Sequence, residues 1–341
     1  MKGARTLIDS TLIPHTAFEN ASSRLEQCFD YAADAAEPIC VAIIGESRTG
    51  KSRVLEECCA SHSTTRQADG LTVPILRVKT PSKPTVKGLA ELMLRAMGDP
   101  RFYAGTEITK TSRLKDLMKK CNTRMVMIDE FQHFYDKASH KVMHYVADWL
   151  KILVDDSHVA LTVAGLPSCM SVVNQNEQLE GRFQAPVVMP RFDWTRGEHR
   201  EEFTAVLGAF HQAMSDEFDL PELDSDEMAF RCYCATGGLM GYLSKFLRQA
   251  VWNALDSQRR EIRLEDLAEA HRKSMWSASS KIGALASQPF SKTFQCAPTE
   301  DVLAMVRQIG EPKVADELVE RPRRRRVIQA PDAVSSVLSA R

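Results

Sequence analysis

The sequence lacks the features of a membrane-spanning or secreted protein. No apolar run is long enough to span a bilayer, and the N-terminus, Met1–Arg5, lacks the apolar core of a secretion signal. The formal net charge of the 341 residues is only −1, so no overall excess of charge indicates a nucleic-acid partner. We therefore expect a cytoplasmic protein in which any contact with nucleic acid depends on local groups of basic residues.

The cysteines also lack the spacing that is typical of a metal site or a disulfide framework. Nine are present, which is an odd number, and no two are spaced as Cys-x-x-Cys. Cys58 and Cys59 are adjacent, Cys232 and Cys234 flank Tyr233, and no second pair of metal ligands stands at the right spacing. The pattern favours reduced thiols in a cytosolic core over zinc or disulfide bonds.

The most informative stretch that is present is a phosphate-binding loop. Four apolar residues, Val41–Ile44, lead into Gly-x-x-x-x-Gly-Lys-Ser, and the following run, Ser52–Cys59, suits a helix. The glycines let backbone N–H groups point at phosphate oxygens, and the positive end of the helix faces the same anion. Lys51 is expected to reach the β- and γ-phosphates, and the Ser52 hydroxyl to bind Mg²⁺. The predicted nucleotide-binding residues of this loop are Gly45, Glu46, Ser47, Arg48, Thr49, Gly50, Lys51 and Ser52.

A strand that ends in two carboxylates strengthens this prediction. The apolar run Met125–Ile128 is followed by Asp129 and Glu130, which is the form of a Walker B motif. Asp129 is expected to hold Mg²⁺ through water, because magnesium keeps much of its hydration shell. Glu130 is expected to polarise the water that attacks the γ-phosphate. Ligands gather at the C-terminal ends of strands in open α/β sheets, so both carboxylates should lie beside Lys51. The sequence thus predicts an ATPase that uses ATP and Mg²⁺.

The pattern of apolar runs predicts a layered α/β domain with a parallel sheet. Helical stretches separate short, β-branched runs that suit buried strands. One whole strand lies between the P-loop strand and the strand that ends at Asp129, which is an arrangement of additional-strand P-loop ATPases. The five predicted strands are Ile39–Ile44, Val73–Val78, Met125–Ile128, Val159–Ala164 and Val187–Met189.

The strands stop near Thr195, and helices follow. A small all-α lid domain is therefore expected after the α/β domain. The tail after about Ser277 has a weaker pattern and contains the arginine-rich run 321–326. The predicted organisation is an N-terminal segment 1–35, a nucleotide-binding domain 36–194, a lid 195–276 and a partner-binding tail 277–341.

An ATPase needs a further positive charge at the γ-phosphate. Arg182 precedes Phe183 and leads into the last predicted strand, where oligomeric ATPases place an arginine that reaches the neighbour's nucleotide. We therefore predict that Arg182 is catalytic, together with Lys51 and Glu130, and that Arg191 is the alternative.

The expected sensor residues are less regular. The strand Val159–Ala164 ends without the usual Asn or Thr, and the start of the lid helix lacks the usual arginine. Lys245 is predicted to touch the nucleotide from that helix, with Arg248 as the alternative. These departures predict slow ATP hydrolysis, which suits a switch better than a motor.

Together these motifs resemble those of a known family. The run Ile128–Phe134, the turn Gly165–Pro167, Arg182-Phe183 and the start of the lid at Thr236–Gly238 join the P-loop in a pattern that resembles the AAA+ transposition regulators TnsC and TniB, over about residues 10–275. The resemblance implies an AAA+ P-loop ATPase fold. It also implies that the protein binds ATP and assembles as a homo-oligomeric ring or helical filament around double-stranded DNA.

The same resemblance implies the partners. Such proteins link a target-selection protein, such as a TniQ/TnsD-type adaptor, to a transposase, and ATP hydrolysis drives disassembly. The resemblance further implies that an N-terminal segment lines the adenine pocket, which would place His15 there.

Two basic segments, Lys79–Lys87 and Thr109–Lys115, lie where family members place their DNA-facing elements. Contacts of this kind bind phosphates without sequence preference. A solvated basic surface is the alternative reading. The candidate DNA-binding residues are Lys79, Lys83, Lys87, Lys110, Thr111 and Arg113.

Three other functions remain open on the sequence. A STAND-type signalling ATPase would carry a long repeat array, and the chain has no internal repeats. An AAA+ initiator or helicase loader would carry a DNA-reading module after the lid, and the residues beyond Met275 are irregular. A nucleotide-binding protein that does not hydrolyse ATP would not need Glu130.

Overall fold

The computed structural model describes residues 4–68, 70–81, 83–275 and 288–310. Residues up to Gly310 form one compact unit, and residues 311–341, which include the arginine-rich run 321–326, lie outside the described residues. Among the described residues, no helix is both long enough and apolar enough to cross a membrane.

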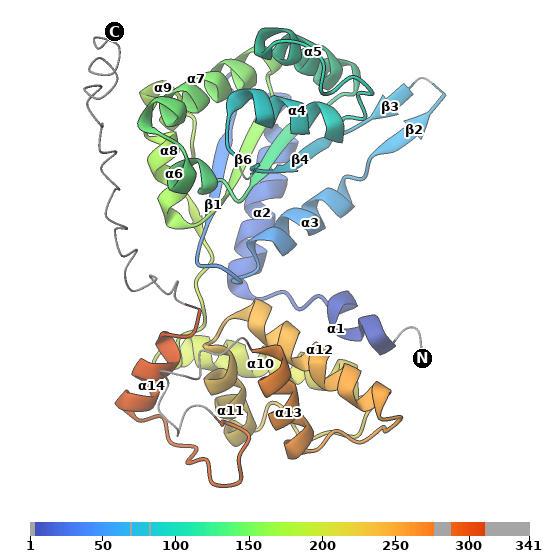
Figure 1. Ribbon diagram of the computed structural model, residues 1–341, viewed down its shortest axis with the longest axis vertical. Helices are drawn as coiled ribbons and strands as arrows, with labels where there is room; N and C mark the ends of the chain where they lie inside the picture. Colours follow the sequence, from blue (N-terminus) through green and yellow to red (C-terminus); the bar gives the residue numbers. More distant parts are fainter. Residues whose placement is uncertain (1–3, 69, 82, 276–287, 311–341) are drawn as a thin grey trace, which may run out of the picture. The chain divides into compact units, whose positions relative to one another are not determined.

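A parallel sheet of five strands forms the centre of the N-terminal part (Figure 1). The strand order is β4-β5-β6-β1-β7, so β6 separates the P-loop strand β1 from the strand β5 that ends at Asp129. The prediction of a five-stranded parallel sheet is confirmed, with bounds that differ by one or two residues. The strands are β1 (Cys40–Ile44), β4 (Ile75–Lys79), β5 (Met125–Asp129), β6 (Ala160–Gly165) and β7 (Val187–Val188).

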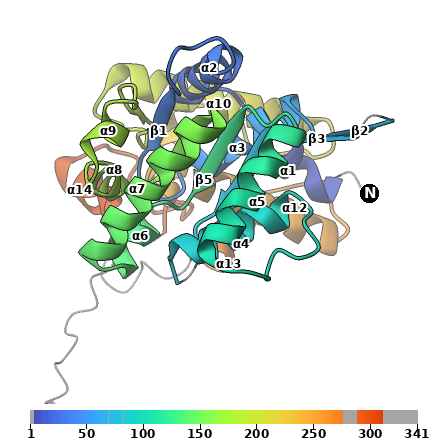
Figure 2. The same cartoon turned by 90° about the horizontal axis from the view of Figure 1, so that it is seen from above.

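Helices cover both faces of this sheet. Alternate residues of a strand point to opposite faces, and apolar side chains on both faces are buried under helices. In β1, Cys40 and Ala42 pack under one helical layer, whereas Val41 and Ile43 pack under the other. Figure 2 shows three helices of the first layer, α4, α5 and α7, side by side over the sheet. The first layer contains α4 (Val86–Ala96), α5 (Glu107–Lys120), α6 (His133–Lys137), α7 (His140–Ser157), η2 (Pro167–Cys169), α8 (Met170–Val173) and α9 (Glu177–Glu180). The second layer contains α2 (Thr16–Tyr31) and α3 (Lys51–Ser61).

A short hairpin that the sequence did not predict follows α3. It consists of β2 (Thr65–Gln67) and β3 (Gly70–Thr72), which pair in antiparallel fashion outside the main sheet. Neither strand has a run of apolar residues, which explains why the apolar pattern gave no signal for it.

The C-terminal part is helical, as expected. Its buried residues form a core of their own, to which α1 contributes Ile8 from the N-terminus. The predicted N-terminal segment is therefore divided: α1 packs with the helical core, and α2 packs on the sheet. The helices are η1 (Ala4–Thr6), α1 (Leu7–Ser10), α10 (Gly197–Ser215), α11 (Asp226–Thr236), α12 (Met240–Asp256), α13 (Leu264–Ser274) and α14 (Glu300–Arg307).

The helical core extends beyond the predicted end of the lid at residue 276. Phe290, Phe294, Val306 and Ile309 are buried in this core. The segment 288–310 is thus a packed element of the helical part. Its apolar residues are widely spaced outside α14, so a pattern of period 3.6 identifies only that short helix.

Candidate functional site

The loop between β1 and α3 has the backbone of a phosphate-binding loop. Arg48 and Gly50 have positive φ values of 69° and 102°, and α3 begins at the next residue, Lys51. The Lys51 ammonium donates hydrogen bonds to the carbonyls of Gly45 (2.8 Å) and Glu46 (2.5 Å). Its charge is therefore held directly over the loop, where the oxygens of a phosphate can replace these carbonyls.

A cleft of about 430 Å³ opens at this loop. That volume lies in the range of about 300–1,000 Å³ typical of small-ligand sites. Burial lowers the pKa of the Lys51 ammonium, and the nearby carboxylates of Glu130 and Asp129 oppose that shift. The structure therefore brings the two predicted motifs together. The cleft is lined by Ser47, Arg48, Gly50, Lys51, Ser52, Arg53, Glu130, Gln132, Leu166 and Gly241.

Asp129 is buried and holds an arginine that the sequence analysis missed. Its Oδ2 accepts a hydrogen bond from Arg77 Nη2 at 3.0 Å, and its Oδ1 accepts one from the Glu130 N–H at 2.9 Å. Arg77 Nη2 also approaches the Ser52 carbonyl at 3.4 Å. The predicted magnesium ligands, Ser52 and Asp129, thus flank one guanidinium. Carboxylate and hydroxyl oxygens, which Asp129 and Ser52 carry, are donors that suit a Mg²⁺ held partly through water.

Glu130 leaves the strand with a left-handed backbone, at φ 57°. Its Oε2 accepts a hydrogen bond from Gln132 Nε2 at 2.6 Å, and the Gln132 Oε1 accepts one from the Leu166 N–H at 3.2 Å. Gly165 makes room for this amide, because a Cβ there would lie 2.3 Å from Gln132 Oε1 and displace it. Gln132 therefore fixes the Glu130 carboxylate against the end of β6, the strand expected to sense the γ-phosphate.

A second pocket of about 290 Å³ adjoins the cleft and shares Gly50, Arg53 and Gly241 with it. The N-terminal residues between Ile8 and Phe18 line much of it, including His15. His15 is buried, and its Nδ1 has no hydrogen-bond partner among the described residues. Burial lowers the His15 pKa, with Glu202 and Glu19 opposing that shift. An unpartnered ring nitrogen in a pocket beside the P-loop suits a purine base.

The start of α12 lies against the P-loop. The Gly241 N–H donates a hydrogen bond to the Arg48 carbonyl at 2.8 Å, and the Arg48 guanidinium lies 4.7 Å from the centre of the Tyr242 ring. Of the described residues that line the two pockets, α12 contributes Met240, Gly241 and Ser244 but not the predicted Lys245. The alternative, Arg248, pairs with Asp9 at 2.5 Å.

The two candidate arginines both have partners within the chain. Arg182 pairs with Asp155, with Nε to Oδ1 at 2.8 Å and Nη2 to Oδ2 at 3.0 Å. Arg191 forms an ion pair with Glu46 of the P-loop. Its Nη1 also donates to the carbonyls of Arg307 (3.0 Å) and Ile309 (2.9 Å). Arg191 thus connects the chain's own P-loop to the C-terminal end of α14 and the residues directly after it.

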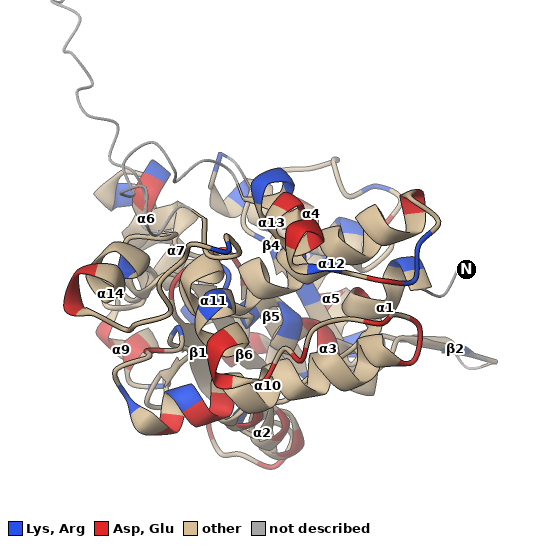
Figure 3. Ribbon diagram, turned by 90° about the horizontal axis from the view of Figure 1, so that it is seen from below, with Lys and Arg blue, Asp and Glu red and all other residues tan. Residues whose placement is uncertain are grey.

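The structure divides the candidate DNA-binding residues into two groups. Lys79, Lys83 and Lys87 are exposed and follow the chain from the end of β4 into α4. On the helical part, by contrast, Lys and Arg are interspersed with Asp and Glu in the view of Figure 3. The first basic segment therefore offers free positive charge beside the sheet.

The second basic segment is corrected by the structure. The Lys110 side chain is fully buried, and its ammonium bonds to Glu91 and to the Phe102 carbonyl, both at 2.8 Å. Arg113 pairs with Asp99 at 2.6 Å. The Thr111 hydroxyl accepts a hydrogen bond from the Trp149 indole at 3.0 Å. The fully buried Lys110 therefore does not present its charge to DNA, whereas Thr111 and Arg113 are half-buried and hold partners within the chain. Lys110 lies four residues before Leu114 and eight before Met118, so it shares the buried face of α5 with these apolar residues.

Several residues of the site were missed from the sequence. Arg77 stands inside the apolar run Ile75–Val78, and a lone arginine in a buried strand is a signal for a buried ion pair. Gln132 stands two residues after Glu130, but its contact with the turn after β6 has no local signature. Gly241 and Arg191 meet the P-loop only through tertiary packing.

Comparison with known proteins gives a family and a fold. The family model described as "Bacterial TniB protein" matches residues 4–194. No curated protein matches the chain.

Three solved structures are similar in fold. Cdc6p from Pyrobaculum aerophilum has a TM-score of 0.59 at 12% identity, over 81% of this chain and 73% of that chain. The ORC2 protein of Aeropyrum pernix, in ADPNP-ADP complexes, has a TM-score of 0.56 at 14% identity, over 79% and 71%. The ORC1 protein of Aeropyrum pernix in complex with DNA has a TM-score of 0.54 at 15% identity, over 79% and 69%. At these identities the likeness shows the AAA+ fold alone.

Proposed function

The chain belongs to the TniB family, and from this premise we propose that it is an ATP-switched regulator of DNA transposition. It assembles on double-stranded target DNA, links a target-selection protein to a transposase, and comes apart when ATP is hydrolysed. The observation that carries the proposal is that Lys51 and Glu130 line one cleft, with the Asp129 carboxylate near Lys51, in a chain of this family. The contact of α12 with the same loop lets the bound nucleotide influence the helical part.

The chemistry assigned to the site follows from its geometry. Lys51 binds the phosphates, and Glu130, positioned by Gln132, accepts a proton from the attacking water. Ser52 and Asp129 are the residues that would hold Mg²⁺, which supplies positive charge to the phosphates when it is bound. His15 and the adjoining pocket would take the adenine.

Two variants test the nucleotide cycle. Lys51→Ala should lose nucleotide binding, measured by calorimetry, and with it assembly on DNA, observed by electron microscopy. Glu130→Gln should keep ATP and remain assembled, because the step that activates water is lost. Lys120→Ala, an exposed lysine at the end of α5, is the matched control and should behave as the native chain. Wild-type protein that takes up ATP but stays monomeric on duplex DNA would refute the proposal.

The DNA surface is assigned to Lys79, Lys83 and Lys87. Each protomer needs only a few exposed basic side chains, because an assembly repeats them along the duplex. Contacts with phosphates release counterions, so affinity falls steeply as salt rises, by about 0.9 log units per log unit of salt for each phosphate contacted.

A change that removes positive charge tests this surface. Replacing all three lysines with Gln should weaken DNA binding. The slope of log affinity against log salt should fall by the equivalent of up to about three phosphate contacts per protomer, and nucleotide affinity should stay unchanged. The control removes two exposed lysines at the far end of α5, Lys119 and Lys120. An equal loss in the control would show that only total charge matters.

Arg182 is retained as the arginine that reaches a neighbour's nucleotide, and its pairing with Asp155 makes a clean test possible. If the pair is only structural, Arg182→Ala and Asp155→Ala should lower the melting temperature alike and leave ATP hydrolysis by the assembly unchanged. If Arg182 acts on the neighbour, Arg182→Ala should abolish hydrolysis in the assembly, whereas Asp155→Ala should preserve it.

A further inference from the structure

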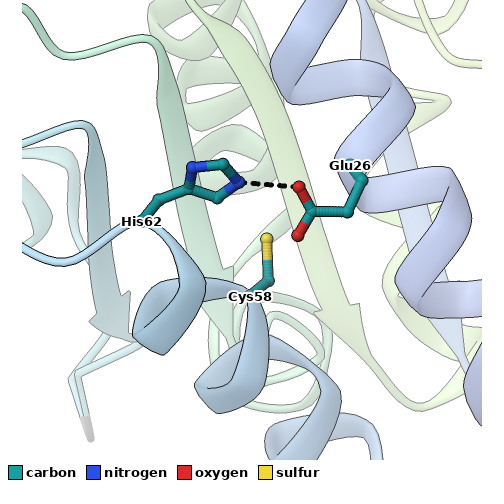
Figure 4. A group of neighbouring side chains, drawn as sticks. All are labelled: Glu26, Cys58 and His62. Atoms are coloured by element: carbon teal, nitrogen blue, oxygen red, sulfur yellow. Dashed lines mark hydrogen bonds and ion pairs between the residues drawn. The ribbon is translucent and has the colours of Figure 1, made fainter.

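We propose that Glu26, Cys58 and His62 form a Zn²⁺-binding site that joins α2 to the C-terminal end of α3. Their donor atoms all lie within 4.8 Å of one another. Figure 4 shows the carboxylate, the sulfur and the imidazole directed toward one point between the two helices. The site is separate from the nucleotide cleft, because α3 begins at the P-loop and these residues lie at its other end.

The helical spacing explains why two of the donors meet. Cys58 lies on the last turn of α3, and His62 is the residue that caps the helix, four positions later. Residues four apart lie on the same side of a helix, so the sulfur and the ring face α2 together. Glu26 of α2 completes the group, with its Oε2 2.6 Å from His62 Nε2. The Phe29 ring stacks on the imidazole with centroids 3.8 Å apart, which holds the ring plane in this direction.

The three donors match zinc in type and spacing. Thiolate, imidazole and carboxylate are the ligands of protein zinc sites, and three protein ligands leave a fourth position for water. Bonds of about 2.0–2.3 Å to a tetrahedral ion place neighbouring donors roughly 3.3–3.8 Å apart. Zinc would take the place of the direct contact between Glu26 and His62, whose atoms would separate from 2.6 Å to this spacing on binding.

The ion can reach the site from solvent, and the proton that Cys58 must lose can leave by the same side. Cys58 is buried, whereas the side chains of His62 and Glu26 are 23% and 38% exposed, so the ion can enter from solvent on their side. Burial, followed by the charge of Glu26, raises the pKa of the Cys58 thiol. The thiol is therefore protonated without the ion, and its proton passes to solvent when the metal–sulfur bond forms.

The neighbouring thiol supplies a matched control. Cys59, the next residue of α3, is half-buried, but its sulfur contacts Met127 Sδ at 3.9 Å and is not part of the group formed by Glu26, Cys58 and His62. A hydrogen-bonded pair of Glu26 and His62 accounts for two members of the group without any metal. The buried Cys58 thiol also interacts with the Glu26 carboxylate, so all three donors converge on one point and offer an ion a ready set of ligands.

The test is a titration of the reduced, chelator-treated full-length protein with Co²⁺ and then Zn²⁺. We expect one Co²⁺ per chain, a near-ultraviolet charge-transfer band from a cobalt–thiolate bond, and loss of that band when Zn²⁺ displaces Co²⁺. Cys58→Ser should abolish the band, and His62→Gln should weaken Co²⁺ binding by at least tenfold. Cys59→Ser should leave both unchanged.

Several outcomes would overturn the assignment. These are a wild-type protein without the band, a band that survives Cys58→Ser, and a band that Cys59→Ser removes. His62→Gln alters a partly exposed side chain, so it remains informative if Cys58→Ser does not fold. None of these measurements uses nucleotide or DNA, so their failure is distinct from a failure of the proposed function.

Discussion

At the scale of single residues, the site depends on polar side chains that hold one another in place. Glu130 is directed by Gln132, Asp129 is held by Arg77, and Lys51 lies on the carbonyls of its own loop. Each of these contacts fixes a charged group before a ligand arrives. Preorganisation of this kind limits the reorganisation needed during a reaction.

The contact between Gln132 and Glu130 yields a kinetic prediction. Gln132→Leu should lower kcat for ATP hydrolysis by about tenfold or more, because general acid–base catalysis contributes about 10²–10⁴-fold and requires a positioned base. Nucleotide affinity should change little, because Gln132 is not expected to bind the phosphates. Steady-state kinetics and calorimetry separate the two effects. Gln175→Leu, at a glutamine that bonds only to the Ser171 carbonyl, is the control. A parallel loss of affinity would argue against a positioning role.

The environment of His15 yields a pH prediction. Burial lowers its pKa, so the folded chain binds this proton more weakly than the unfolded chain, whose histidines titrate near about 6.5. The stabilisation is complete above that value and is lost as the pH falls toward the folded pKa. The free energy of unfolding, measured in urea, should therefore decline less between about pH 7.5 and about pH 5.5 in His15→Asn than in the wild type. His144→Asn, at an exposed site, should retain the wild-type decline.

At the scale of secondary-structure elements, the P-loop is held between two parts of the fold. The start of α12 bonds to Arg48, and the chain after β7 pairs with Glu46 through Arg191. Movement of the helical part is thus coupled mechanically to the loop that binds phosphate. This connection gives nucleotide binding a route to the helical part.

Gly241 tests this contact. A Cβ at this position would lie 2.9 Å from Arg48 Cβ and 3.1 Å from the Arg48 carbonyl oxygen. Gly241→Ala should therefore push α12 away from the P-loop and reduce nucleotide affinity, at a cost of about 1–3 kcal/mol for overpacking. Gly197→Ala, where a Cβ meets nothing within 4 Å, should leave affinity unchanged. Equal affinities for the two variants, measured by calorimetry, would remove α12 from the binding site.

At the scale of the whole molecule, the helical core contains segments that come before and after the sheet domain in the chain. Ile8 enters it from the N-terminus, and Phe290, Phe294 and Ile309 enter it after α13. The contacts of Arg191 with the carbonyls of Arg307 and Ile309 tie this last segment to the nucleotide site.

Two truncations test the role of this segment. A chain that ends at residue 310 should keep its melting temperature and its nucleotide affinity, because residues 1–310 form a compact unit. A chain that ends at residue 298 loses the buried side chains of Val306 and Ile309, which contribute about 1.5–3 kcal/mol each. Its melting temperature, measured by calorimetry, should fall clearly. If both chains melt alike, α14 is not an integral part of the core.

The sequence by itself determined the features that depend on near neighbours in the chain. The P-loop, the acidic end of β5, the five strands and the family resemblance all follow from patterns within a few residues, because backbone geometry and apolar periodicity act locally. The family and the α/β fold are confirmed on that basis.

Only the tertiary structure decided which polar groups become partners. It buried Lys110 against Glu91, paired Gln132 with Leu166, and brought Glu26 to Cys58 and His62 from another helix. Such pairings join residues far apart in the chain. They depend on how whole elements pack. The sequence shows the same residue letter for a charged side chain whether it is solvated or buried with a partner.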